Sequence, residues 1–451
     1  MKSNEKRAAK EAAQITKLEK VSSAKPYKGY LMVLFILLAA VHVLDNYTSE
    51  IVGSVQSHII NDFFIRGMGM DMSSALSANT LITTALSMIT IFAAFYKGLA
   101  DKFGRKVFFI ISCFGMGFGM LVIFMAQDLA TYVIGRTIIS FFVATDIQVL
   151  YITEIAPADK RGLYFSIASF IASLGNLLIP AMRAAFIGDD GSGWRNCFFL
   201  PGLIGVCLAV LIFFFAKESP VWVEKRLALL KTPFEEREND KKKNENKTGI
   251  FEALKEIFRD KQLRSLFLSY TAMVSATMFM ISYTEPILQA AGFTEAQITA
   301  FYVSYPLMGA VINLINGPIS DRIGRKKACV LFGVLTILGF LAYFLGAGAG
   351  LNAYLVGALY GLSITSYWAV LNIMIMMISE SAPTRIRASA AGSTSLVGLV
   401  GSILISILLG ILLGTGMDLG WTCFGGGTIL TVIGLLITVF FAKETAGKEL
   451  E

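Results

Sequence analysis

The chain is poor in the residue types on which metal sites, disulfide frameworks and enzymatic centres depend. Among 451 residues there are 2 histidines, His42 and His58, and 5 cysteines, and only 16% of residues are charged. The histidines share no motif with cysteine or aspartate, and the cysteines lie in or beside apolar runs without close pairing. We therefore expect no metal, no other cofactor, no disulfide and no enzymatic activity. The cysteines are Cys113, Cys197, Cys207, Cys329 and Cys423.

Hydrophobic residues are in excess, at 55% of the chain, which is more than a soluble core buries. Twelve apolar runs each approach the ~20 residues that cross about 30 Å of hydrocarbon as a helix. No alternating strand pattern is present, and backbone amides in lipid must pair within their own segment, so every run is predicted to be helical. The runs lie near residues 30–54, 75–96, 107–127, 131–153, 163–187, 195–216, 265–290, 297–318, 327–347, 353–378, 389–414 and 420–442.

Basic residues predict the orientation of these helices. If both termini are cytoplasmic, 35 of the 39 Lys and Arg fall in cytoplasmic segments, as the positive-inside rule requires. This bias explains the net charge of +7 without a nucleic-acid partner. Residues 1–29 are predicted to be a cytoplasmic tail and not a cleaved signal. Within them residues 5–21 are predicted to be disordered, with a surface helix as the alternative. The remaining four basic residues are Arg66, Arg136, Arg183 and Arg195.

The chain contains an internal duplication. The segments Phe214–Ser219 and Phe440–Thr445 read nearly alike at an offset of 226 positions, and Glu154-Ile-Ala-Pro returns as Glu380-Ser-Ala-Pro at the same offset. Two matches at one offset predict two related six-helix bundles in a parallel repeat. The predicted boundaries are a tail at 1–29, one bundle at 30–216, a cytoplasmic linker at 217–262, a second bundle at 263–442 and a second tail at 443–451.

A loop that contains Asp-x-x-Gly-Arg-Lys follows the second helix of each half. The first copy begins at Gly98 and the second at Gly317. This loop resembles the signature of the major facilitator superfamily, and the resemblance covers all twelve predicted helices. The segments at Glu154 and Glu380, with those after helices six and twelve, are similar to the sugar-porter and organic-ion-transporter branches.

The resemblance implies a cytoplasmic gate. In similar transporters the acids and arginines of these loops pair with those at the ends of helices four, five, ten and eleven, hold the outward-open state, and separate when the bundles rock. The alternative is that they only anchor short loops among the lipid headgroups. The expected gating residues are Gly98, Asp101, Gly104, Arg105, Glu154, Arg161, Asp321, Arg325, Glu380 and Arg387.

Charges in the apolar runs point to function, because a charge left in lipid costs on the order of 3 kcal/mol or more. Asp45 in helix one with Arg136 in helix four resembles proton-coupled sugar porters, which implies that Asp45 is the proton-coupling carboxylate and Arg136 its partner. A static ion pair is the alternative. Asp146, predicted near the membrane midplane, is a rival for the coupling role.

The expected substrate site combines charged residues of the first half with aromatic residues of the second. Helices seven and ten lack the amide pair and the Gly-Pro-x-Pro-Trp stretch usual in sugar porters, so a hexose is not expected. Pro286, directly after Glu285, predicts a gating kink in helix seven. The candidate substrate-binding residues are Asn46, Glu50, Asp146, Gln148, Asn176, Tyr283, Glu285, Tyr305, Asn313, Tyr367, Trp368 and Asn372.

The sequence thus predicts an all-α membrane protein of twelve transmembrane helices, in the plasma membrane or a bacterial inner membrane. Its predicted function is proton-coupled symport of an amphiphilic, organic acid-like solute by alternating access. A sugar or polyol symporter or uniporter and a proton-coupled drug exporter are the alternatives. The expected partners are the substrate, protons and lipid, and the protein is expected to act as a monomer.

Overall fold

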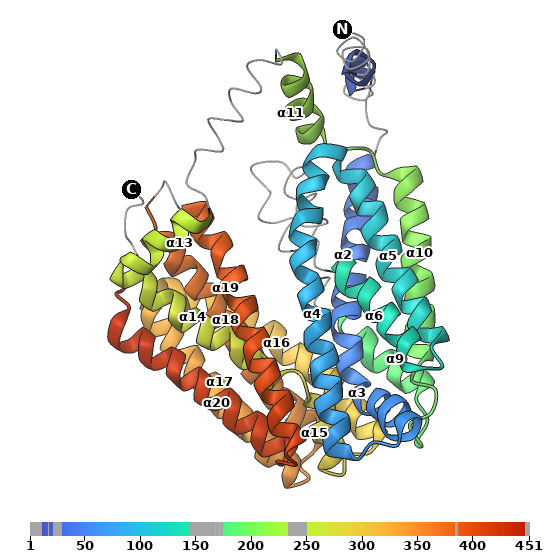
Figure 1. The fold of residues 1–451 in the computed structure, drawn as a ribbon, viewed down its shortest axis with the longest axis vertical. Coiled ribbons are helices and arrows are strands. Elements are labelled where there is room, and N and C mark those ends of the chain that lie inside the picture. Colours follow the sequence, from blue (N-terminus) through green and yellow to red (C-terminus); the bar gives the residue numbers. More distant parts are fainter. Residues whose placement is uncertain are drawn as a thin grey trace. The chain divides into compact units, whose positions relative to one another are not determined.

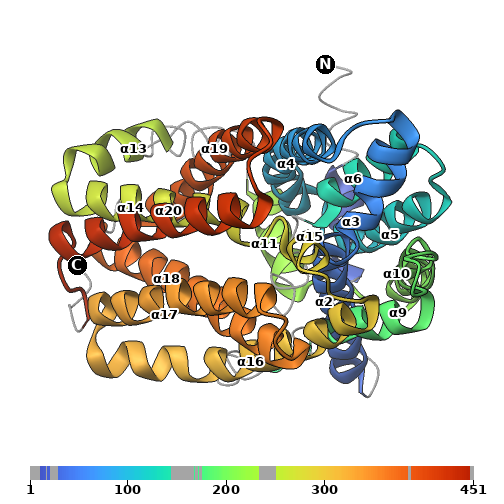
Figure 2. The ribbon, with the colours of Figure 1, turned by 90° about the horizontal axis from the view of Figure 1, so that it is seen from below.

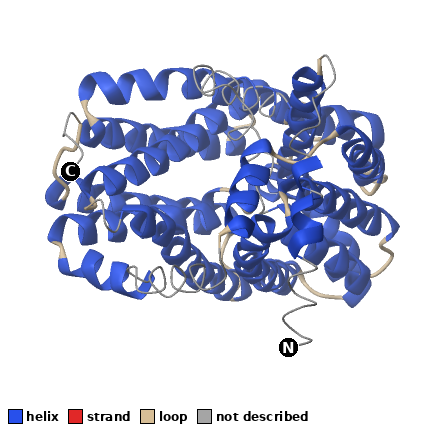
Figure 3. Cartoon of the chain, turned by 90° about the horizontal axis from the view of Figure 1, so that it is seen from above, coloured by secondary structure: helices blue, strands red, loops and turns tan. Residues whose placement is uncertain are grey.

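The computed structural model describes residues 11–16, 18–20, 29–143, 175–232, 250–383 and 387–446, with Ile167 and Ile171. Within these residues every regular element is a helix (Figure 3). The elements named below are α2 (Tyr30–Ser54), α3 (Gln56–Ile59), the π-helix η1 (Ile60–Arg66), α4 (Met72–Phe103), α5 (Arg105–Met125), α6 (Leu129–Val143), α9 (Leu178–Phe186), α10 (Asn196–Phe215), α11 (Pro220–Lys231), α13 (Ile250–Arg259), α14 (Lys261–Met280), α15 (Thr284–Ala290), α16 (Glu295–Ile323), α17 (Arg325–Gly348), α18 (Ala353–Ser381), α19 (Arg387–Gly414) and α20 (Leu419–Phe441).

Eight of the described helices are long and apolar enough to cross a membrane, or nine if the bent pair α14 and α15 forms one span. These two helices meet at an angle of 42°, and the bend lies just before Pro286, where the sequence predicts a kink. The predicted runs at 131–153 and 163–187 extend beyond the described residues. Twelve helices and cytoplasmic termini therefore remain predictions.

The chain divides into two compact units. The first comprises Met1–Ser49, Ile89–Gly175 and Phe198–Lys247, and the second Glu50–Met88, Asn176–Cys197 and Thr248–Glu451. Helices α2, α4 and α10 contribute residues to both.

In the first unit, α5 packs closely against α6 and α10 (Figure 1). A Cβ added at Gly117 of α5 would lie 2.8 Å from the carbonyl oxygen of Gly202 in α10. On another face of α5, a Cβ at Gly119 would lie 3.1 Å from the carbonyl oxygen of Gly135 in α6. Small residues of this kind let membrane helices approach until their backbones touch.

The amino-terminal tail is partly helical, which corrects the prediction of disorder and agrees with the alternative of a surface helix. Residues 11–16 and 18–20 are helical, and Leu18 is buried in a cluster with Trp222, Val223 and Leu230 of α11. The Lys231 ammonium lies 2.7 Å from the Glu19 carboxylate. Burial of apolar side chains against α11 supplies the stabilisation that a solvated tail lacks.

Among the eight long apolar helices α18 is the most buried, and it packs against α14, α16, α17 and α19. Figure 2 shows it beside α17. Phe301, Tyr302 and Tyr305 of α16 stack with Tyr343 of α17 and Tyr360 of α18, with ring centroids 5.1–6.1 Å apart. One face of α19 carries an exposed apolar stripe at Leu396, Val400, Leu404, Leu408 and Ile411, the pattern of a lipid-facing surface.

The second unit also contains segments of the first repeat. It includes the last turn of α2, α3, η1, the first half of α4, and α9. In it α9 packs on α16 and α3 packs on α15. We call this region the outer end, because the distribution of basic residues predicts that it faces away from the cytoplasm.

Candidate functional site

The Gly-Arg-Lys loops have the same geometry in both repeats. Gly104, which precedes α5, has φ +114°, and the backbone N–H groups of Arg105 and Lys106 donate to Oε1 of Glu218 at 2.6 and 3.1 Å. A Cβ at Gly104 would collide with that carboxylate. Glycine is therefore required both by the backbone conformation and by the space that the carboxylate occupies.

The second copy repeats this arrangement in the second unit. Gly324 has φ +92°, and the N–H groups of Arg325 and Lys326 donate to Oε1 and Oε2 of Glu444 at 2.8 and 3.1 Å. Each helix that follows the loop thus begins with a carboxylate on its amide groups, which satisfies N–H donors and suits the helix dipole.

The pKa values of the two carboxylates are shifted in opposite directions. Burial raises the pKa of Glu218, although N–H groups of Lys106, Ser219 and Arg105 oppose the shift. Burial also acts against ionisation of Glu444, but four backbone N–H groups outweigh it and lower the pKa. These four are contributed by Ala446, Thr445, Lys326 and Arg325.

The structure brings together three of the predicted gating residues in the second half. The Arg325 guanidinium lies 2.6 Å from Asp321 and 3.5 Å from Glu380. The Thr445 hydroxyl donates to Glu380 at 2.6 Å, so the carboxy-terminal segment after α20 joins the same network. Of the other predicted gating residues, Glu154 and Arg161 lie outside the described residues, as do the surroundings of Gly98 and the side chains of Asp101 and Arg387.

The predicted coupling pair lies in the first unit. Asp45 in α2 and Arg136 in α6 are both partly buried, and within the described residues no ion pair joins them. Asn46 donates from its amide to the backbone carbonyl of His42 at 3.0 Å. Asp146 and Gln148 lie outside the described residues. The coupling roles therefore stay predictions.

Several of the candidate aromatic residues pack inside the protein. Tyr367 is fully buried and donates to the Met273 carbonyl at 2.5 Å. Tyr283 is 1% exposed, contacts the Thr80 hydroxyl and donates to the Leu76 carbonyl at 3.0 Å. Both hydroxyls are thus used within the fold, and Tyr283 ties the bend before α15 to α4.

Three other substrate candidates, on α16 and α18, have exposed side chains. Trp368 of α18 is 47% exposed, and Asn372, one turn further, is also exposed, as is Asn313 of α16. Glu50 lies close enough to interact electrostatically with Tyr305 and Tyr360 of the aromatic cluster. The Asn176 amide oxygen, just before α9, is buried without a hydrogen-bond partner in the described residues.

The outer end holds a buried cluster of charged side chains. The Arg183 guanidinium of α9 lies 2.6 Å from Glu295 and also donates to the Ser54 carbonyl. Nε2 of His58 lies 3.3 Å from the other oxygen of Glu295. Glu285 is fully buried and accepts from the Ser57 N–H at 2.7 Å. We call His58, Arg183, Glu285 and Glu295 the outer cluster.

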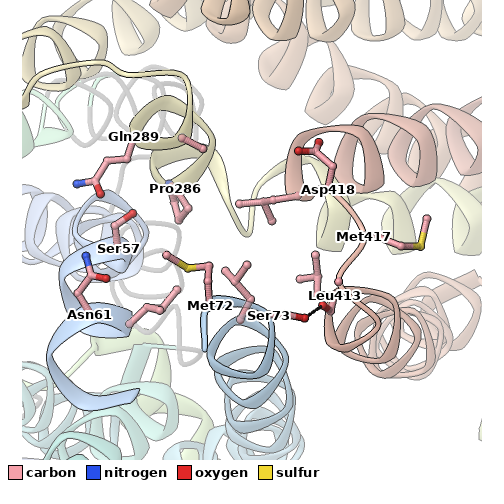
Figure 4. Close-up of a pocket in the computed structure, with 14 residues that line it drawn as sticks. Ser57, Asn61, Met72, Ser73, Pro286, Gln289, Leu413, Met417 and Asp418 are labelled. Carbon is pink, nitrogen blue, oxygen red and sulfur yellow. Dashed lines mark hydrogen bonds between the residues drawn. The ribbon is translucent and has the colours of Figure 1, made fainter. Parts of the chain in front are cut away.

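Two pockets flank the outer cluster. One, of about 470 Å³, lies between the end of α3, the start of α4, α15 and the α19–α20 turn. In Figure 4, Ser57, Asn61 and Gln289 face it from one side and Met72, Leu413 and Asp418 from the other. The second, of about 330 Å³, is polar and is lined by His58, Asn61, Asp62, Asp190 and Arg195, among others.

Comparison with known proteins identifies the family. Residues 33–406 match the family model of the Major Facilitator Superfamily. The chain belongs to this superfamily. It is therefore a multi-pass membrane transporter and not an enzyme, as the sequence predicts, and alternating access is the general behaviour of this family.

Relatives of the superfamily carry several kinds of solute. The chain is 26% identical over 379 residues to the glucose transporter GlcP of Staphylococcus epidermidis, covering 78% of this chain and 82% of the relative. It is 25% identical over 386 residues to the cis,cis-muconate transport protein of Acinetobacter baylyi, covering 82% and 86%. A solved D-xylose-proton symporter has the same fold, with a TM-score of 0.71 at 17% identity over 93% of this chain and 100% of that one.

The sequence analysis did not single out four charged or titratable residues that the structure places in the Gly-Arg-Lys loops and the outer cluster. Glu218 and Glu444 were noted only as parts of a repeated motif, although that repetition at one offset already indicated a shared role. His58 and Glu295 carried no local signal. His58 belongs to no motif, and Glu295 stands in an ordinary helix start, Thr294-Glu-Ala-Gln, where an acid in the first turn has a capping explanation.

Proposed function

We propose that this protein is a proton-coupled symporter of a small hydroxylated solute, a sugar or polyol, that works by alternating access. The observation that carries the proposal is the exposed stripe of Trp368 and Asn372 on α18, with Asn313 on α16. This reverses the order of preference drawn from the sequence, in which an organic ion came first.

Few environments in a membrane protein suit the exposed polar side chains of this stripe. Most of α18 is buried, its other exposed large apolar residues being Tyr354, Leu355 and Met376. An asparagine exposed to lipid would leave its amide without partners. Asn313 lies on a different side of α16 from the exposed apolar residues Leu307, Val311 and Leu314. These polar side chains therefore fit a water-filled cavity.

The chemistry of the stripe suits hydroxyl groups. An indole offers a flat apolar face with one N–H donor, and each carboxamide offers donors and acceptors together. No charged side chain belongs to the stripe. The burial of Tyr283, Tyr305 and Tyr367 removes most of the aromatic wall that favoured an amphiphilic ion. The glucose transporter relative and the fold shared with a xylose-proton symporter support the same solute class.

Proton coupling is supported by the acid and arginine in α2 and α6. Asp45 and Arg136 stand at only partly buried positions in apolar helices, and ionisable residues inside membrane helices usually belong to ion or proton paths. In this proposal Asp45 binds the coupled proton, Arg136 favours its ionised form, and the cytoplasmic network around Arg325 opens and closes during the cycle.

Transport by purified protein in vesicles tests the proposal. Sugars and polyols should be accumulated when the outside is made acidic, and Asn372→Ala should raise the KM about tenfold or more, as expected when a buried polar contact to substrate is lost. Leu404→Ala, on the lipid-facing stripe of α19, is the matched control and should leave the KM unchanged. Accumulation of organic acids with no sugar or polyol uptake would refute the solute class.

An organic acid is the second candidate, favoured by Arg136 in the first unit and by the muconate-transporting relative. For this class, uptake should depend on Arg136 and tolerate Asn372→Ala.

A further inference from the structure

The outer cluster has one positive charge too few. It holds two carboxylates, Glu285 and Glu295, and one permanent cation, Arg183. The guanidinium is enclosed, with a side-chain exposure of 0%, while that of Glu295 is 12%. An unbalanced charge in such a place is costly. One additional proton would make the cluster neutral.

His58 is placed to take that proton. Its Nε2 lies 3.3 Å from Oε1 of Glu295, and imidazole is the side chain whose charge ordinarily changes between pH 5 and 8. Glu285 is the other acceptor nearby, because its Oε1 has no hydrogen-bond partner among the described residues. A proton on either group gives the cluster equal numbers of positive and negative charges.

The proton has a route from the outer side. His58 lines the polar 330 Å³ pocket, and its ring lies against Gly191 in the segment before α10. The other charged groups of that pocket largely cancel, because Asp62 pairs with Arg195 at 2.9 Å and with Arg66 at 3.6 Å. The groups that face His58 are thus Glu285 and Glu295 from the second repeat, Arg183 from α9, and Asp62, Arg66, Asp190 and Arg195 around the pocket.

The cluster also joins the two repeats. His58 and Arg183 come from the first repeat, and Glu285 and Glu295 from α15 and α16 of the second. Any opening of the outer end has to separate α3 and α9 from α15 and α16. Separation would move the two carboxylates away from a protonated His58. The closed arrangement therefore binds the proton more tightly than the open one. By linkage, binding of the proton favours closure.

We propose that the outer cluster is a second proton-binding site, at which a proton taken up from the outer side through His58 holds the outer end closed. The site adds to the coupling carboxylate Asp45 of the proposed function and does not require it. Closure of the outer end on protonation suits a symporter, because protonation from outside then promotes the step that carries the solute inward.

Accessibility of a buried position at the outer end tests the proposal. Leu76 of α4 is 6% exposed beside the Tyr283 contact, and Met72 on the same helix is 55% exposed. In full-length protein whose five native cysteines are replaced, Leu76→Cys would be labelled in vesicles from outside with an impermeant maleimide between pH 5.5 and 8. Dividing by the rate for Met72→Cys removes the pH dependence of the reagent.

In the parent, the normalised rate should fall at least about fivefold from pH 8 to 5.5, the lower end of usual coupling factors. His58→Gln, which is never charged, should give a high rate at every pH, and His58→Lys, which is always charged, a low one. His42→Gln is the matched control, because His42 is the only other histidine, and it should titrate like the parent.

A fivefold fall that persists in His58→Gln would overturn the proposal, as would a parent rate independent of pH. Asp45→Asn separates this result from the proposed function. It should keep the titration of the outer end while losing accumulation driven by a proton gradient. If the parent accumulates solute with the gradient but shows no titration at Leu76→Cys, the second site is wrong and the proposed function stands.

Discussion

Glu444→Gln should destabilise the protein more than Glu218→Gln at neutral pH, although the two carboxylates occupy equivalent places in the repeats. Oε1 of Glu444 accepts from Arg325, Thr445 and Ala446, and Oε2 accepts from Lys326, at 2.8–3.1 Å. Hydrogen bonds to a charged group contribute about 1.5–3 kcal/mol each, roughly twice the value for a neutral acceptor. Glutamine loses the Lys326 bond and weakens the other three, and because Glu444 is exposed and water screens these bonds, we expect a loss of about 1–2 kcal/mol.

The pKa shifts give the two sites opposite pH dependences. Because Glu444 has a lowered pKa in the folded protein, its stabilisation is complete above the unfolded value near 4.5 and is lost as the pH falls through the folded value. Glu218 has a raised pKa, so its contribution is complete below the unfolded value and is lost as the pH rises through the folded one. Above the unfolded value, therefore, the contribution of Glu444 is complete and constant, whereas that of Glu218 declines as the pH rises.

Thermal unfolding of purified protein at pH 5 and pH 7 measures both effects. Glu444→Gln should lower the unfolding midpoint equally at the two values. Glu218→Gln resembles the protonated residue, so the difference between its midpoint and that of the parent should become more positive from pH 5 to pH 7. Glu224→Gln, at an exposed position of α11, controls for the loss of a cytoplasmic charge. Equal destabilisation by Glu218→Gln and Glu444→Gln at pH 7 would refute the reasoning.

Three further changes test other parts of the structure. Gly324→Ala should cost about 1–2 kcal/mol for the positive φ alone and lower the unfolding midpoint, whereas Gly317→Ala, which has open space around it, should not. Asp45→Asn should abolish accumulation driven by a proton gradient yet retain exchange between equal pools, and loss of exchange as well would count against a coupling role. Arg183→Met should cost the closed outer end about 3–5 kcal/mol by breaking a buried pair, and should therefore raise the labelling rate of Leu76→Cys at every pH.

Spans were predictable because an uninterrupted apolar run determines where a membrane helix lies. The run at 30–54 coincides with α2, and that at 353–378 differs from α18 only at its end. Larger errors occur where local capping overrides hydropathy. Helix α16 begins at Glu295, two residues before the predicted run, because Thr294 and Gln297 form a capping box. It continues to Ile323, where Gly324 with its positive φ ends it.

The candidate site was less predictable, because it depends on burial and on contacts between distant segments. The sequence singled out Glu285 as a charge in an apolar run, but not its environment. His58 and Arg183 lie 237 and 112 positions before Glu295, and no local pattern indicates that they meet. Burial also decides which aromatic residues are available to contact a substrate. Tyr367 and Trp368 are neighbours in sequence, but Tyr367 lies on the buried side of α18 and Trp368 on the exposed side.

The energy needed for switching bears on the proposal of two proton sites. Moving a two-state equilibrium from 1:99 to 99:1 requires about 5.5 kcal/mol of differential binding. One proton whose pKa differs by two units between the states supplies only about 2.7 kcal/mol. Closure of the outer end by the outer cluster alone would therefore be partial, and the remainder has to come from the substrate and from a proton on Asp45. Such a division makes full closure depend on both ligands, which is the condition for coupled transport without proton leak.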